Sequence, residues 1–369
     1  MRCAKVSWPK DLGIKSRWMQ RLIGLGLPLA MIMAGATSAV AATVSISDAP
    51  MANGTGTQIK PNLMFVLDDS GSMRSTFIPD LVENFAASKD SDRRYGYASA
   101  ACNGVYYNPS VTYKPPVKAD GTSYPSASFV AAKLDGFDES ASATVVDLRT
   151  NFRAYESSGG AAGGGVNDTA QAAYYYVYTG TNQPLSYAYL ANGDVDTTAQ
   201  IKGKDTLYAE CNSKIDSKPG KNVFNLVNVT KESAAVQQNF ANWYSYYRSR
   251  MNTMKSSAGW AFKNMPHPET FRIGFSTHRY TGVDSANISF QQIADFCGID
   301  GTICDQRTQF YQKLYGAQPG GFTPLRSAMT KIGRMYAGKL LTGANDPVQY
   351  SCQQNFLVMA TDGFWNEDA

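Results

Sequence analysis

The sequence predicts an α/β fold with a doubly wound, mostly parallel sheet and a large β-rich insertion after the first strand. Two short runs, the apolar 63–67 and 355–360, which is apolar after Asn355, lack the alternation of a strand with one solvent-exposed face, so we expect them inside a sheet. Each run ends in a polar loop, and a helical pattern of apolar residues begins at Leu325, between them in the sequence. Buried strands that alternate with helices are typical of α/β domains.

The first strand and the loop after it occupy residues 61–75, and the loop reads Asp-Asp-Ser-Gly-Ser-Met. Asp68, Ser70 and Ser72 leave the strand together at its carboxyl end, the edge at which ligands bind in open α/β sheets. One carboxylate and two hydroxyls at alternate positions are hard oxygen donors suited to Mg²⁺, Mn²⁺ or Ca²⁺. Asp68 alone would also fit a helix cap or a turn.

Two later loops offer further oxygen donors. Gly-Gly-Phe-Thr-Pro-Leu places Thr323 just before a helical pattern, and Ala-Thr-Asp-Gly places Asp362 just after a buried strand. The full set resembles the metal-ion-dependent adhesion site of von Willebrand factor A domains: Asp68, Ser70, Ser72, Thr323 and Asp362. This resemblance implies a Rossmann-like A domain that holds a divalent cation, with Mg²⁺ expected first and Mn²⁺ or Ca²⁺ as alternatives.

Residues 1–42 have the features of a signal peptide: a basic start, an apolar run from Leu22 to about Gly35, and small residues at 39–41 for cleavage. The alternative is an uncleaved anchor. Residues 43–60, rich in Ser, Gly, Thr and Asn, are expected to be a linker. No later stretch is long and apolar enough for a transmembrane helix, so we expect an exported chain that enters the periplasm.

The charge of the chain gives no indication of nucleic-acid binding. The whole sequence has a net charge of +4, and residues 1–42 hold six basic side chains and one acidic side chain, so the remainder is close to −1. Beyond residue 42 no basic run is interleaved with aromatic residues. We therefore expect no nucleic-acid partner.

The cysteines predict disulfides, as is usual in an oxidising compartment. Cys297 and Cys304 are close in sequence and are expected to pair, and Cys102 with Cys211 would form a second bridge. Cys352 is then left unpaired, or paired outside the visible chain. Zinc binding is not expected, because no Cys-x-x-Cys occurs and the histidines are His267 and His278.

Residues 76–232 are predicted to be the insertion, placed beside the metal loop. This segment is rich in glycine and holds 14 of the 22 tyrosines. Tyrosine among Ser, Gly and Asn is typical of adaptable recognition loops, but tyrosine also favours strands, and composition does not decide between the two interpretations. The helix of an A domain would arrive only at about 233–256, where apolar residues recur every three or four positions.

Residues 233–369 are expected to form the remainder of the A domain. We predict its second strand at 271–276 and a short edge strand at 287–290. His278 would lie near the top of the sheet, and both histidines are interpreted as hydrogen-bonded structural residues. A complete A domain continues beyond its third metal loop, so the sheet is expected to be incomplete at the carboxyl end.

A narrower resemblance rests on longer motifs, including Tyr-Asn-Pro at 107–109, Trp-Tyr-Ser-Tyr-Tyr at 243–247 and Ala-Thr-Asp-Gly-Phe-Trp-Asn at 360–366. Together with the signal peptide, they resemble the amino-terminal part of the type IV pilus tip-associated adhesin and assembly family, called PilY or PilC. Members of that family continue into a β-propeller with its own calcium site, which this sequence does not include. The resemblance implies pilin or minor-pilin partners, a location at the pilus tip or outer membrane, and a surface ligand that offers a carboxylate.

Binding is expected rather than catalysis. The sequence has no Gly-x-Ser-x-Gly elbow, no P-loop and no His-Glu-x-x-His, and it has almost no histidine to act as a general base. The alternatives are a purely structural pilus-assembly factor and a metal-dependent hydrolase.

Overall fold

The computed structural model describes residues 59–79, 82, 93–154, 169–181, 210–299 and 303–363. The predicted signal peptide and all but the last two residues of the predicted linker lie outside the described residues, as does the Phe-Trp-Asn segment at 364–366.

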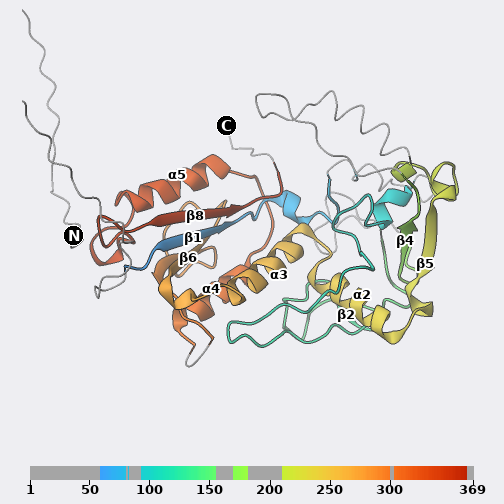
Figure 1. Cartoon of the computed structure of the whole chain (residues 1–369), viewed down its shortest axis with the longest axis horizontal. Coiled ribbons are helices and arrows are strands. Elements are labelled where there is room, and N and C mark those ends of the chain that lie inside the picture. The colour runs from blue at the N-terminus through green and yellow to red at the C-terminus, as the bar shows by residue number, and fades with distance from the viewer. Residues whose placement is uncertain are drawn as a thin grey trace, which may run out of the picture.

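A four-stranded sheet of order β7-β6-β1-β8 forms the part of the molecule at the left of Figure 1. β1 pairs in parallel with both β6 and β8, and β7 pairs antiparallel with β6 at the opposite edge. The strands are β1 (Asn62–Leu67), β6 (Arg272–Thr277), β7 (Phe290–Asp295) and β8 (Asn355–Ala360). The predicted α/β class and mostly parallel sheet are confirmed.

Helices cover both faces of this sheet, because β1 is apolar on both sides (Figure 1). Met64 packs with residues of helix α5, including Ile332. Phe65 points to the other face, where its ring lies 5.4 Å from that of Phe262 in α3 and 6.3 Å from that of Phe310 in α4. These helices are α3 (Arg250–Lys263), α4 (Asp305–Gly316) and α5 (Leu325–Tyr336).

Three of the predicted elements are wrong in detail. The run at 355–360 was expected inside a sheet, but β8 lies at the edge of the described sheet, and its residues are exposed or half-buried. The edge strand runs from Phe290 to Asp295 rather than over 287–290, where the chain still turns. The expected helix over 233–256 is two helices, α2 (Ala234–Tyr246) and α3. The break is stabilised locally: the hydroxyl of Ser249 accepts a hydrogen bond from the amide of Asn252 and so caps α3.

The described part of the insertion holds less strand than predicted. Its strands form two small antiparallel sheets of two strands each, β2 with β3 and β4 with β5, and most of the remainder is turns and single turns of 3₁₀ helix. The strands are β2 (Ala132–Lys133), β3 (Val145–Val146), β4 (Tyr174–Tyr178) and β5 (Phe224–Asn228). The 3₁₀ turns of the described chain are Gly71–Arg74, Tyr95–Ala98, Gly220–Asn222, Val229–Lys231, Pro268–Thr270 and Gly343–Asn345.

Aromatic packing holds the insertion together. α2 lies against it (Figure 1). The indole nitrogen of Trp243 donates to the carbonyl of Val105 at 2.9 Å. Seven described tyrosines of the insertion are at most 8% exposed, namely Tyr95, Tyr97, Tyr106, Tyr107, Tyr124, Tyr174 and Tyr175. Because these rings are buried, they form a core and are not available as a recognition surface.

The expected disulfides Cys102–Cys211 and Cys297–Cys304 are both present. Cys352 is also disulfide-bonded, with a partner outside the described residues. The first of the two alternatives for Cys352, an unpaired thiol, is therefore wrong. Within the described ranges no helix has the length and hydrophobicity needed to span a bilayer.

Candidate metal centre

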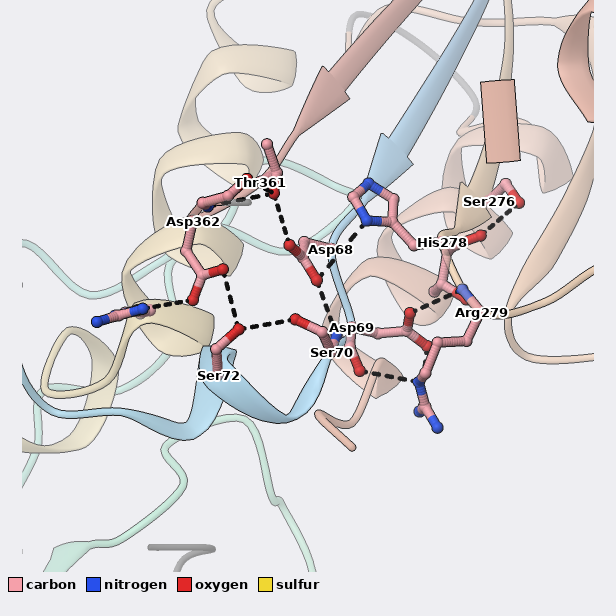
Figure 2. Close-up of polar contacts among 12 residues, drawn as sticks. Asp68, Asp69, Ser70, Ser72, Ser276, His278, Arg279, Thr361 and Asp362 are labelled. Atoms are coloured by element: carbon pink, nitrogen blue, oxygen red, sulfur yellow. Dashed lines mark hydrogen bonds and ion pairs between the residues drawn. The ribbon is translucent and has the colours of Figure 1, made fainter. Parts of the chain in front are cut away.

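Asp68 joins the ends of two neighbouring parallel strands. It follows β1 directly and is fully buried. One carboxylate oxygen accepts the amide of Ser70 at 2.8 Å, and the other accepts the hydroxyl of Thr361, just after β8, also at 2.8 Å (Figure 2). A buried carboxylate needs such donors, and they fix its orientation at the sheet edge. Thr361 was not predicted as a site residue, although it stands next to Asp362.

The hydroxyls of the first loop continue the chain of oxygen atoms. The Oγ atoms of Ser70 and Ser72 lie 2.9 Å apart, and Ser72 donates to Oδ1 of Asp362 at 3.0 Å (Figure 2). The structure therefore brings together four of the five predicted residues: Asp68, Ser70, Ser72 and Asp362.

The second loop is held against the first by two backbone hydrogen bonds. The amide of Gly71 donates to the carbonyl of Gly321, and the amide of Gly320 donates to the carbonyl of Asp69. A Cβ on Gly71 would lie 3.2 Å from the Gly321 carbonyl, and Gly321 has a φ of 62°, so this approach favours glycine at both positions. Thr323 lies two residues further on and is 5% exposed. Its loop is therefore held beside the first loop by these backbone hydrogen bonds.

Arg250 is part of the site and was not predicted. Its guanidinium lies 2.7 Å from Oδ2 of Asp362, in an ion pair whose side chains are 4% and 8% exposed. The same side chain donates to the carbonyl of Phe77, and the Arg250 amide donates to the carbonyl of Ser75. One residue therefore connects the start of α3, the entry to the insertion and the third loop.

A second buried carboxylate fixes the surrounding loops. Asp69 accepts the amide of Arg279, and the Arg279 guanidinium lies 3.2 Å from the other oxygen of the Asp69 carboxylate (Figure 2). Two adjacent aspartates thus have different roles: Asp68 faces the candidate metal loop, and Asp69 anchors the segment after β6.

The environment of His278 differs from the predicted one. The residue lies at the top of β6, as expected, but both ring nitrogens are buried without a hydrogen-bond partner, so it is not a hydrogen-bonded structural residue. Its Nδ1 is 3.7 Å from Oδ1 of Asp68. Burial lowers the pKa of His278, while the neighbouring carboxylate of Asp68 opposes this shift. His267, by contrast, is exposed and faces Glu269 at 3.4 Å.

The donor chemistry fits a hard divalent cation. In the described part of the chain no cluster of three His, Cys, Asp or Glu residues could hold a metal, so hydroxyls would have to complete any site. Asp68, Ser70, Ser72 and Asp362 supply oxygen atoms alone, the donor type that Mg²⁺, Mn²⁺ and Ca²⁺ prefer. The Arg250 guanidinium neutralises part of the negative charge of Asp362 and so weakens the attraction of this carboxylate for a cation.

The sequences of known proteins align with nearly all of this chain. It is 28% identical over 363 residues to the type IV pilus biogenesis factor PilY1 of Pseudomonas aeruginosa strain PAK, and 27% identical over 362 residues to PilY1 of strain PAO1. Each match covers 92% of this chain and 26% of the relative, so the chain spans about a quarter of the length of these curated relatives. No protein-family model and no solved structure matches the chain.

Proposed function

We propose, from this relationship to the PilY/PilC-type family, that the chain is a non-enzymatic type IV pilus biogenesis and adhesion factor. In this proposal a divalent cation bound at Asp68, Ser70, Ser72, Thr323 and Asp362 contacts a carboxylate on a surface or partner ligand. The chain would be exported to the periplasm and act with pilins or minor pilins at the pilus tip or outer membrane. The fold would be a von Willebrand factor A domain that carries the insertion.

One observation carries the metal proposal: oxygen donors from two strand ends far apart in sequence meet at one edge of the sheet. Asp68 and Asp362 are separated by nearly the whole described chain, yet they are linked through Ser70 and Ser72 by hydrogen bonds of about 3 Å. The carboxyl edge of a parallel sheet is the expected position of a ligand site in this fold class.

The chain's own groups would have distinct roles. Asp68 supplies the buried negative charge and is oriented by the Ser70 amide. Ser70 and Ser72 supply neutral oxygen atoms, and the Ser72 hydroxyl donates to the Asp362 carboxylate. Arg250 sets the orientation of Asp362 and lowers the net charge. When bound, the cation would supply positive charge for a charge-assisted contact with the ligand carboxylate.

Asp68→Asn tests this function in the bacterium. Asparagine has the shape of aspartate, whereas alanine would leave the buried donors of Ser70 and Thr361 unpaired. Adhesion should fall strongly and lose its dependence on Mg²⁺. Asp138→Asn removes an exposed carboxylate of the insertion and should leave adhesion unchanged. Normal metal-dependent adhesion by a stable Asp68→Asn chain would refute the proposal.

A purely structural assembly role is the second candidate, and the buried Arg250–Asp362 pair favours it because this pair already stabilises the loop without a metal. This role predicts that Asp68→Asn leaves pilus number and adhesion unchanged, whereas removal of the insertion lowers both. A metal-dependent hydrolase would instead show saturable turnover of an ester, peptide or phosphate substrate that the same substitution abolishes.

A further inference from the structure

A small pocket lies between α5 and the segment that follows β6, on the sheet face opposite α3 and α4. Its volume is about 240 Å³, and its polar lining includes His278, Thr281, Thr330, Lys331 and Arg334. α5 contributes one face of its helix to the pocket, where positions 327, 330, 331 and 334 recur at helical spacing. The predicted metal residues are not part of the lining.

The lining is positively charged. It contains Lys331 and Arg334 and no aspartate or glutamate. Lys331 is 6% exposed and donates to the hydroxyl of Ser276 and the carbonyl of Tyr280. Both acceptors are neutral and orient the ammonium group, and the nearby Asp69 carboxylate partly offsets the effect of burial on its pKa. Burial lowers the pKa of Lys331 to about 8, which leaves it charged at neutral pH.

His278 gives an independent indication of a ligand. It lines the same pocket, is 1% exposed, and has no hydrogen-bond partner at either ring nitrogen. Buried polar groups in native proteins are nearly always satisfied, so an unpaired imidazole at a pocket wall indicates a missing partner. A neutral imidazole can donate one hydrogen bond to an acceptor in the pocket.

We propose that this pocket binds a small oxyanion, a phosphate or a carboxylate group, between Lys331, Arg334 and His278. Lys331 provides charge at the base, the exposed Arg334 provides a planar donor pair suited to either group, and the hydroxyls of Thr281 and Thr330 offer neutral hydrogen bonds. The pocket adjoins the proposed metal site through His278, whose Nδ1 is 3.7 Å from Asp68, but anion binding here does not depend on a bound metal.

Calorimetric titration of the whole chain with inorganic phosphate and with succinate tests this site. The buffer contains a chelator, so metal binding cannot contribute. Either anion, or both, should bind saturably, and the tighter one identifies the preferred group. Arg334→Gln should weaken binding at least tenfold. Lys339→Gln removes an equivalent exposed charge just beyond α5 and should change affinity less than twofold. Arg334 is exposed, so its replacement should not impair folding.

Imidazole nitrogen NMR gives a second measurement, because the sequence contains two histidines. The His278 signals should shift on anion addition, while the exposed His267 serves as an internal reference. No saturable binding of either anion, equal loss of binding in Arg334→Gln and Lys339→Gln, or a His278 signal that responds to Mg²⁺ and not to anions would overturn the proposal.

Discussion

Replacement of Arg250 by methionine should destabilise the chain strongly, because it leaves a buried carboxylate without its partner. The guanidinium lies 2.7 Å from Asp362, and both side chains are less than a tenth exposed. Removing one partner of a buried ion pair costs about 3–5 kcal/mol. Loss of the hydrogen bond to the Phe77 carbonyl adds about 1 kcal/mol. We therefore expect the free energy of unfolding to fall by about 4–6 kcal/mol.

A double-mutant cycle in urea separates the ion pair from the packing of Arg250. Asp362→Asn removes the unpaired charge. The free energy of unfolding of the double variant should therefore exceed that of Arg250→Met alone by about 2 kcal/mol or more. Arg149→Met removes a partner of the exposed ion pair with Asp147 and should leave the urea midpoint nearly unchanged. A loss below about 1 kcal/mol for Arg250→Met, or additive effects in the cycle, would refute the argument.

Three further predictions concern stability and use the same urea titrations. Lys255→Met should raise the free energy of unfolding by about 1–3 kcal/mol at pH 7, because burial lowers the pKa of this ammonium to about 8. This gain in stability over the wild type should shrink above pH 8, because Lys255 of the folded wild type then releases a proton that the unfolded chain keeps. A constant gain up to pH 10 would contradict this. Replacing Cys102 and Cys211 with alanine opens a link across 109 positions and should cost about 4–5 kcal/mol, so a cost below about 1 kcal/mol would argue against a structural role. Gly321→Ala should cost about 1–2 kcal/mol, because φ is 62° and the new Cβ would lie 3.1 Å from the Arg279 side chain; an unchanged midpoint would contradict this.

The sheet and most of the candidate site could be predicted because their signals are local. The apolar run of β1 and the polar loop after it are contiguous, so Asp68, Ser70 and Ser72 follow from strand geometry alone. Asp362 is the second residue after β8, one position later than Asp68 is after β1, and parallel pairing of the two strands brings their loops together.

The features that were missed depend on long-range geometry. Arg250 reaches Asp362 because the expected single helix breaks before Ser249, and nothing in the apolar spacing indicates that break. The buried environment of His278 depends on how α5 lies over the sheet, which the sequence around the histidine does not specify. The tyrosines of the insertion likewise acquire their role from mutual packing, so composition alone left two interpretations open.

Metal titration of the purified chain tests the central claim most directly. The wild-type chain should bind one Mg²⁺ or Mn²⁺ ion saturably in a calorimetric titration, Asp138→Asn should match it, and Asp68→Asn should show no saturable binding while it keeps the wild-type unfolding midpoint in chelator. Equal binding by Asp68→Asn and the wild type, or no binding by the folded wild-type chain, would contradict the account.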